Sequence, residues 1–355
     1  MKKTILVTGG AGFIGSAVIR YILDNSDFKV INIDKLTYAS SLSSLKKYDK
    51  NKNYILKKID ICNQKKTLEI IKKYSPQLIM HLAAETHVDR SINSANNFVN
   101  TNIIGTYNML EVSKKYYQNL NIRNKKKFRF HHISTDEVYG DLKKKSPPAD
   151  EEFKYNPSSP YSASKASADH LVRSWFRTYN LPVIISNCSN NYGPYQFPEK
   201  LIPLIILNAL EKKKLPVYGN GQQIRDWIYV DDHAEALFKI ITKGKVGETY
   251  NIGGNEQIKN RNVVRIICNI LDKIKPLNVK NKKYSDLIVY VKDRPGHDKR
   301  YAINIKKIQK KLNWYPKENF KTGIYKTIKW YMNTNNLTDN FGKKHYERKR
   351  LGLIR

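Results

Sequence analysis

The side chains best suited to chemistry in this sequence are Tyr161 and Lys165, which lie four residues apart. Ser159-Pro160 is a typical helix start, so both side chains are expected on one face of the same helix. A lysine ammonium beside a tyrosine lowers the pKa of the phenol. A Tyr and a Lys at this spacing also occur by chance, but the pair predicts a tyrosine that exchanges a proton with a substrate hydroxyl.

A glycine-rich loop supplies the context for that pair. Gly9-Gly10-Ala11-Gly12-Phe13-Ile14-Gly15 follows an apolar run and opens a helical stretch, the setting of a dinucleotide-binding fingerprint. Its glycines permit a tight turn, a close approach of the pyrophosphate and helix packing, and the helix N-terminus favours phosphate. Asp34, about 20 residues further on, is expected to accept hydrogen bonds from the ribose and to disfavour NADP. The pattern predicts NAD, with Lys165 on the nicotinamide ribose.

Thr135-Asp136-Glu137 forms a second reactive group. Thr135 could provide the hydroxyl group of a catalytic set made of a Thr, a Tyr and a Lys. Hydride transfer needs only the tyrosine, whereas two adjacent carboxyl groups could act as general acid and general base for the loss of water. The alternative is a solvated turn.

The elements that must position these residues follow from six apolar runs that are typical of buried parallel strands. The runs are Thr4 to Thr8, Phe28 to Ile33, Tyr54 to Ile59, Leu78 to Leu82, Phe128 to Ser134 and Pro182 to Ser186. Amphipathic helical stretches alternate with them. This predicts an α/β fold, a Rossmann-type doubly wound parallel sheet with a smaller C-terminal α/β substrate domain, and ligands at the carboxyl ends of the strands. Asp60-Ile61 and Leu82-Ala83-Ala84 lie at two such ends and are expected beside the cofactor.

The chain is expected to divide into two domains and a tail. Residues 1–189 would be the NAD-binding domain. Residues 190–332, rich in Pro and aromatic connections, would mainly bind the substrate, with a segment near 227–250 returning to the first domain. Residues 333–355 read as a basic C-terminal tail.

The composition limits the kinds of molecule that the protein is expected to bind. The formal net charge of +33 comes from lysines scattered without aromatic interleaving, so we expect solubility and attraction of an anionic substrate rather than nucleic-acid binding. No run of about 18 apolar residues is present, so no membrane span is expected. The three cysteines are widely spaced, which predicts no disulfide framework, no metal site and a cytoplasmic location.

Several longer motifs resemble the dTDP-glucose 4,6-dehydratases, a family of extended short-chain dehydrogenases/reductases of the NAD-dependent epimerase/dehydratase type. The resemblance spans about residues 4 to 330. It rests on Ser134-Thr135-Asp136-Glu137-Val138-Tyr139-Gly140, on residues 157–165, on Asp34-Lys35-Leu36-Thr37-Tyr38-Ala39, on His87-Val88-Asp89-Arg90-Ser91, on residues 190–203 and on residues 225–232.

The resemblance implies a reaction in three stages. Tyr161 would take the proton of the sugar 4-hydroxyl while NAD accepts hydride from C4. Glu137 would then remove the C5 hydrogen while Asp136 protonates the leaving 6-hydroxyl. Return of the hydride to C6 would regenerate NAD within each turnover, so the net reaction of dTDP-glucose is a dehydration.

The resemblance also implies the site. Catalytic residues would be Thr135, Asp136, Glu137, Tyr161 and Lys165. Cofactor contacts would be Gly9, Gly12, Phe13, Ile14, Gly15, Asp34, Lys35, Leu36, Thr37, Asp60, Ile61, Leu82, Ala83, Ala84, Thr86, Thr101, Tyr161, Lys165 and Asn191. Substrate contacts would be Thr86, His87, Thr135, Asn190, Lys200, Leu201, Pro216, Val217, Tyr218, Arg225, Asn260, Arg294 and His297. Family members pair through two helices, here about 100 to 117 and 161 to 179, which implies a homodimer.

Six alternatives stay open. A 4-epimerase or a UDP-glucuronate decarboxylase would share the glycine loop and Tyr161/Lys165, but an epimerase has no use for an acid and a base at C5 and C6. UDP-glucose and GDP-mannose dehydratases are harder to exclude. A catalytically silent NAD-binding scaffold typically lacks the tyrosine or the lysine, and a nucleic-acid-binding module is suggested by charge alone.

Overall fold

The computed structural model describes residues 3–333, so most of the tail expected at 333–355 lies outside the described residues. Its centre is a parallel sheet in the order β10-β6-β5-β4-β1-β2-β3. The strands are β1 (Thr4–Thr8), β2 (Lys29–Asp34), β3 (Tyr54–Lys58), β4 (Leu78–His81), β5 (Arg129–Thr135), β6 (Val183–Cys188) and β10 (Thr249–Ile252). The α/β fold with a doubly wound parallel sheet is confirmed.

Both faces of this sheet are buried, which explains why its strands are continuous apolar runs. Successive residues of β1 point to opposite faces: Ile5 and Val7 join one core cluster and Leu6 joins another. Helices α1 (Phe13–Asn25) and α9 (Val230–Lys243) pack together over the first face. Helices α2 (Gln64–Tyr74), α5 (Gly105–Gln118) and α7 (Pro160–Tyr179) cover the second.

The strand order reverses between β1 and β4, the position where doubly wound sheets leave a crevice for a ligand. Short helical segments follow the strand ends near this crevice. They are η1 (Leu42–Tyr48), α3 (Val88–Asn93), α4 (Asn96–Phe98), η2 (Val99–Ile104) and η3 (Asp136–Tyr139), while α6 (Ile122–Lys125) precedes β5.

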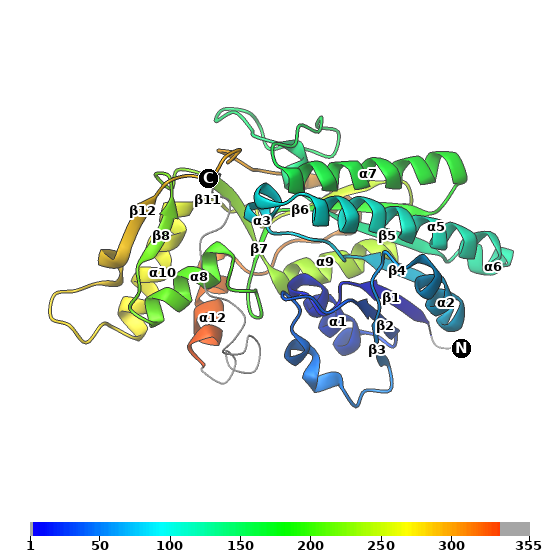
Figure 1. The fold of residues 1–355 in the computed structure, drawn as a ribbon, viewed down its shortest axis with the longest axis horizontal. Helices are drawn as coiled ribbons and strands as arrows, with labels where there is room; N and C mark the ends of the chain where they lie inside the picture. The colour runs from blue at the N-terminus through cyan, green and yellow to red at the C-terminus, as the bar shows by residue number, and fades with distance from the viewer. Residues whose placement is uncertain (1–2, 334–355) are drawn as a thin grey trace.

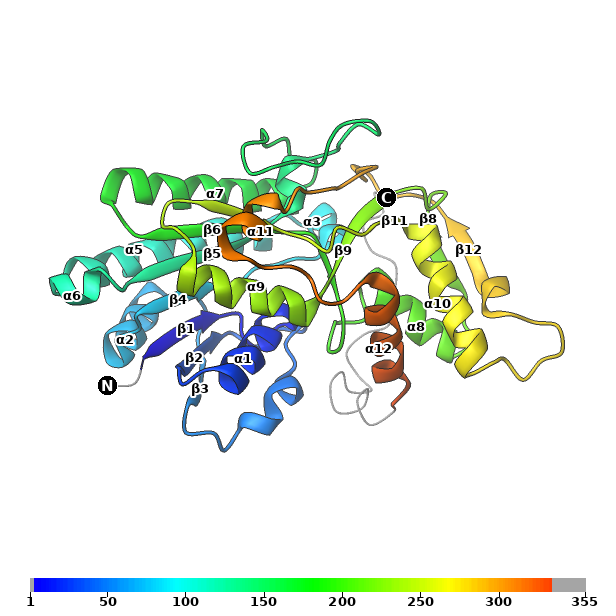
Figure 2. The same cartoon turned by 180° about the vertical axis from the view of Figure 1, so that it is seen from behind.

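A second group of elements gathers beside the large sheet (Figures 1 and 2). It contains a sheet in the order β11-β9-β7, a parallel pair of β12 and β8, and helices that share a separate core cluster. Their bounds are β7 (Asn190–Tyr192), α8 (Leu201–Leu210), β8 (Leu215–Tyr218), β9 (Ile224–Tyr229), β11 (Gln257–Lys259), α10 (Asn260–Ile274), η4 (Tyr284–Leu287), β12 (Ile288–Val291) and α12 (Phe320–Met332).

The chain crosses between the two groups more than once. After β9 it returns to the large sheet as α9 and β10, and β10 pairs with β6. It returns again at α11 (Lys306–Leu312), where Ile308 and Leu312 join the core on the α9 side. Among the helices of residues 3–333, none combines the length and apolar character needed to cross a membrane.

Candidate active site

The glycine loop forms a tight turn from the end of β1 into α1. Gly9 has a φ of +71°, and a Cβ there would lie 2.7 Å from the Ala83 backbone. A Cβ at Gly15 would lie 2.1 Å from the Gly9 carbonyl oxygen, so this position packs the helix against the turn. Gly12 lines a cavity and caps α1 without any side-chain hydrogen bond. The first turn of α1 therefore presents its N–H groups to that cavity, as a dinucleotide phosphate requires.

Asp34 closes the same cavity at the end of β2. Its carboxylate accepts hydrogen bonds from Ala11 N at 2.9 Å, Leu36 N at 2.7 Å and Ser40 Oγ at 3.2 Å. A carboxylate offers about four acceptor positions, so one remains for a ribose hydroxyl. Asp34 thereby joins the glycine loop to the next loop and stays able to bind a ligand.

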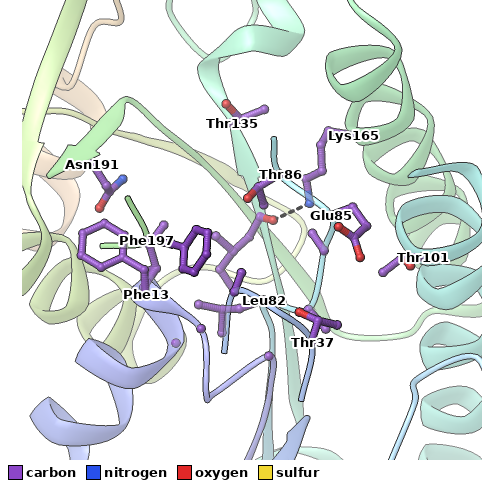
Figure 3. A pocket seen from close by; sticks show the side chains of 18 of the residues that line it. Phe13, Thr37, Leu82, Glu85, Thr86, Thr101, Thr135, Lys165, Asn191 and Phe197 are labelled. Atoms are coloured by element: carbon purple, nitrogen blue, oxygen red, sulfur yellow. Dashed lines mark hydrogen bonds between the residues drawn. The ribbon is translucent and has the colours of Figure 1, made fainter. Parts of the chain in front are cut away.

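The cavity brings together the cofactor contacts expected from the sequence, with one exception. Its lining includes Gly9, Gly12, Phe13, Ile14, Gly15, Asp34, Lys35, Thr37, Asp60, Ile61, Leu82, Ala83, Ala84, Thr86, Thr101, Tyr161, Lys165 and Asn191. Leu36 is the exception: it adopts a φ of +60° and contributes its backbone N–H to Asp34. Figure 3 shows Phe13, Phe197 and Asn191 on one side of the view and Lys165, Glu85 and Thr101 on the other.

Tyr161 and Lys165 lie in the first turns of α7, whose start follows from the sequence. Ser159 and Ser162 form a capping box, and Pro160 occupies the first turn. Both side chains are buried. Lys165 Nζ donates to the Ile133 carbonyl oxygen at 2.8 Å, the hydrogen bond drawn in Figure 3.

The pKa of Tyr161 does not follow the expectation from the sequence. Burial and the nearby Glu137 carboxylate raise it well above the usual value, while a hydrogen bond with Thr135 lowers it only in part. Lys165 is directed at the β5 backbone, so in this arrangement it does not lower the phenol pKa. In this structure the expectation that Lys165 lowers the pKa of Tyr161 is therefore wrong.

The carboxyl pair lies where β5 turns into η3. Thr135 Oγ1 accepts a hydrogen bond from Glu137 N at 3.3 Å and donates to Asp136 Oδ1 at 3.4 Å. Burial and the neighbouring Glu137 raise the pKa of Asp136 well above its usual value. Burial also raises the pKa of Glu137, but Arg294, Arg225 and Lys200 oppose that rise.

A second cavity adjoins the first, because six residues line both: Glu137, Asn190, Asn191, Gln196, Glu199 and Lys200. It collects the expected substrate residues His87, Asn190, Lys200, Leu201, Pro216, Val217, Tyr218, Arg225, Asn260, Arg294 and His297. The remaining two, Thr86 and Thr135, line the first cavity. Glu137 faces both cavities and thus lies at their junction.

The cations of the second cavity are held by specific partners. Arg225 is buried, donates to the carbonyl oxygens of Ile224 and Asp298 at 2.8 and 2.9 Å, and stacks over Tyr301. Lys200 Nζ donates to the Thr86 carbonyl oxygen at 2.7 Å. A cluster of cations of this kind suits an anionic ligand such as a diphosphate.

Two acidic residues of this region were not assigned from the sequence. Asp89 accepts a hydrogen bond from Arg294 Nη1 at 2.8 Å and one from the Tyr218 hydroxyl at 2.9 Å. The Glu199 side chain is 2% exposed and pairs with Arg90 at 3.2 Å, and Tyr38 donates to it at 3.2 Å. Both residues stand inside motifs noted in the sequence, but their partners are more than 100 positions away, so no local pattern reveals the contacts.

Comparison with known proteins identifies the family. The family model described as GDP-mannose 4,6 dehydratase matches residues 6–327. A dTDP-glucose 4,6-dehydratase of Escherichia coli is 56% identical over 361 aligned positions, covering 99% of each chain.

Solved structures agree. The Bacillus anthracis dTDP-glucose 4,6-dehydratase in complex with NAD aligns with a TM-score of 0.82 and 44% identity, over 93% of this chain and 96% of that one. The Streptomyces venezuelae enzyme, with NAD and dTDP bound, gives a TM-score of 0.84 and 38% identity over 93% and 97%. The resemblance inferred from the motifs is confirmed: the chain belongs to the dTDP-glucose 4,6-dehydratase family.

Proposed function

We propose that this chain converts dTDP-glucose into dTDP-4-keto-6-deoxy-glucose and water, using bound NAD. The observation that carries the proposal is that the proton-transfer pair Tyr161/Lys165 and the carboxyl pair Asp136/Glu137 all line the first cavity. Glu137 also lines the second cavity, so the pairs lie where the two cavities meet at Glu137. The names and bound ligands of the relatives support the same reaction.

The residues around the first cavity fit NAD. The open backbone at Gly12 and the free N–H groups of α1 would hold the pyrophosphate, Asp34 the adenosine ribose, and Lys165 the nicotinamide ribose. When bound, NAD would take up the hydrogen removed from C4 and give it back at C6.

Tyr161 would accept the proton of the sugar 4-hydroxyl. Its buried neutral phenol is a poor base. A reorientation of Lys165 toward the ribose and phenol would supply the positive charge that favours the phenolate. The Thr135 hydroxyl lowers the pKa of the phenol, and it would stabilise the phenolate by turning its proton from Asp136 toward the phenolate oxygen.

Asp136 and Glu137 would divide the acid and base roles at C5 and C6. The pKa of Asp136 is raised well above its ordinary value, so this residue would carry the proton that the 6-hydroxyl needs to leave as water. Three cations oppose the rise at Glu137, so Glu137 is the easier of the two to ionise and would remove the C5 hydrogen. Environments that separate two carboxyl pKa values are a usual means of assigning an acid and a base.

Arg225, Arg294 and Lys200 would bind the diphosphate, with the rest of the second cavity enclosing the nucleotide. The nearest alternatives are dehydratases of UDP-glucose or GDP-mannose, and the description of the matched family model favours testing the latter. A 4-epimerase leaves the Asp136/Glu137 pair without a role.

Purified protein should therefore be offered dTDP-glucose, UDP-glucose and GDP-mannose in parallel, with each product identified by NMR. We expect dTDP-glucose to give the 4-keto-6-deoxy sugar fastest. The matched control is Glu137→Gln, which keeps the shape of the site and removes the base. Turnover of another sugar with no reaction of dTDP-glucose would overturn the substrate assignment.

We also propose a homodimer and a cytoplasmic location. Val99, Ile104, Tyr107 and Tyr179 are each more than 40% exposed, and they lie on η2, α5 and α7, the helices implicated by the family resemblance. Exposed apolar residues on two adjacent helices suit an interface. Ile104→Lys should shift the mass measured by light scattering toward a monomer, whereas Ile122→Lys, a change at a 76% exposed residue on α6, should not.

Cell fractionation tests the proposed cytoplasmic location.

A further inference from the structure

A buried carboxylate behind the active site has no role in the reaction proposed above. Asp169 lies on α7 and is fully buried. It is the third residue of a series at four-residue spacing, after Tyr161 and Lys165, so all three share one face of the helix. A fully buried carboxylate is costly unless it is paired, so its partners show what it stabilises.

Asp169 contacts the end of β5 with both oxygens and makes its hydrogen bonds through Oδ2. Oδ2 accepts hydrogen bonds from Ser134 Oγ at 2.8 Å and from the Tyr155 hydroxyl at 2.9 Å. Oδ1 lies 3.2 Å from His132 Nε2. Ser134 is the residue immediately before Thr135. The Asp169 carboxylate therefore contacts the strand that ends at Thr135 and is followed by Asp136 and Glu137.

Lys165 contacts the same stretch of β5. Its Nζ donates to the Ile133 carbonyl oxygen at 2.8 Å and lies 3.5 Å from His132 Nε2. Three consecutive residues of β5 are thereby tied to two residues of α7. One imidazole nitrogen lies between the Lys165 ammonium and the Asp169 carboxylate.

Of the charged groups around Lys165, Asp169 contributes most to raising the pKa of Lys165. Burial lowers the pKa of Lys165, and Asp169 raises it, with a further contribution from Cys188 on β6. His132 has its pKa lowered to about 4 by burial and by Lys165. His81 on β4 likewise has its pKa lowered well below the usual value, so both imidazoles are neutral. Burial raises the pKa of Asp169, but the contact with His132 and the charges of Lys165 and Arg173 on α7 keep it below the ordinary value.

We propose that Asp169 is a positioning residue that keeps Lys165 charged and holds β5 against α7, so that the Tyr161/Lys165 and Asp136/Glu137 pairs stay aligned. The proposal rests on the proposed function, because it assumes that Lys165 acts as a cation beside Tyr161 and NAD. It adds a functional residue outside both cavities, since Asp169 lines neither of them.

Two charge-free variants test the proposal, Asp169→Asn and Asp169→Ser, so that a folded chain is available if one of them fails. Asp169→Glu is the conservative rescue, because it retains the anion. Ser134→Ala is the matched control, because it removes one hydrogen bond to Asp169 and leaves the charge in place. Each is compared with the wild type by the pH profile of kcat/KM for dTDP-glucose and by calorimetric titration with NAD between pH 7 and pH 10.

Loss of the carboxylate should make Lys165 easier to deprotonate. In Asp169→Asn or Asp169→Ser the alkaline limb of the profile should move to lower pH by about one unit, and NAD affinity should begin to fall at a correspondingly lower pH. The rate should fall about 10-fold with the KM for dTDP-glucose little changed. Asp169→Glu and Ser134→Ala should keep the wild-type alkaline limb.

An unchanged alkaline limb and unchanged pH dependence of NAD affinity in the charge-free variants would overturn the proposal, leaving Asp169 a purely structural residue. An equal shift in Ser134→Ala or Asp169→Glu would overturn it too, because the carboxylate charge would not be the cause. Failure of the wild type to convert dTDP-glucose would instead refute the proposed function, and the NAD titration would still decide the role of Asp169.

Discussion

Replacement of Asp89 by Asn is expected to weaken binding of the nucleotide without disturbing NAD. Asp89 lies on α3, beside the large sheet, and holds Arg294 and Tyr218 of the second group of elements. Burial raises the pKa of Asp89, but the Arg294 guanidinium more than offsets this, so the carboxylate is ionised. The ion pair is largely buried, with side-chain exposures of 17% for Arg294 and 6% for Asp89.

Two effects of the substitution compete. The Asp89 charge repels a diphosphate, so its removal would favour binding, but Arg294 already neutralises that charge at 2.8 Å. The charge-assisted hydrogen bond that orients Arg294 contributes about 1.5–3 kcal/mol. A neutral Asn acceptor would retain about 0.5–1.5 kcal/mol of this, so the loss of about 1–1.5 kcal/mol should raise the Kd for dTDP roughly 5- to 15-fold. Asn keeps an acceptor for Arg294, and the Tyr218 hydroxyl can rotate to accept from the amide, so the fold should survive.

Calorimetry with dTDP and, separately, with NAD measures the effect, and kinetics with dTDP-glucose should show a raised KM. Tyr218→Phe is the matched control, because it removes one hydrogen bond to Asp89 and leaves the ion pair, so only a few-fold loss of dTDP affinity is expected. Wild-type or tighter dTDP binding by Asp89→Asn, or an equal loss of NAD affinity, would show that Asp89 does not orient Arg294 for the nucleotide.

Three further predictions concern the base, the glycine loop and acid stability. Glu137→Gln should lower the rate of keto-sugar formation by roughly 10²- to 10⁴-fold while dTDP affinity stays near the wild-type value; a variant with more than a tenth of wild-type activity would show that another group is the base. Gly9→Ala should lose NAD affinity, because the added Cβ would lie 2.7 Å from the Ala83 backbone. The control Gly247→Ala, at a φ of +83° outside the cofactor cavity, should lose thermal stability but keep its NAD affinity. Equal NAD affinities in the two variants would contradict this. Burial lowers the pKa of His131 from 6.5 to about 3, so the stability that its neutral form contributes is full above pH 6.5 and is lost as the pH falls toward 3. The wild-type advantage over His131→Asn in urea unfolding should therefore shrink between pH 7 and pH 5, and a constant difference would be inconsistent with a buried neutral imidazole.

The sequence predicts most of the sheet because its strands are buried on both faces and therefore read as unbroken apolar runs. The run at Thr4 to Thr8 matches β1, and the run at Pro182 to Ser186 is extended to Cys188 in β6. Polar Asn187 cannot be recognised as a strand residue from hydropathy. It is buried because its amide donates to the Tyr139 hydroxyl at 2.8 Å.

Local signals also position the motifs. The sequence alone indicates a glycine turn at Gly9, a Ser-Pro helix start at 159–160 and a hydroxyl residue at the end of β5, because each signal acts over a few residues. Contacts between residues that lie far apart in the sequence are not indicated in this way. Asp89 pairs with Arg294, 205 positions away, and Lys165 is directed at the β5 backbone and not at Tyr161. The raised Tyr161 pKa follows from burial, which spacing does not reveal.

In the proposed reaction one site removes hydride from C4 and returns it to C6. This transfer can be followed with dTDP-glucose that carries deuterium at C4, by NMR of the product formed in unlabelled water. We expect a 4-keto-6-deoxy sugar with the deuterium at C6. A C4 epimer that keeps its deuterium at C4, or a keto sugar without deuterium at C6, would contradict it.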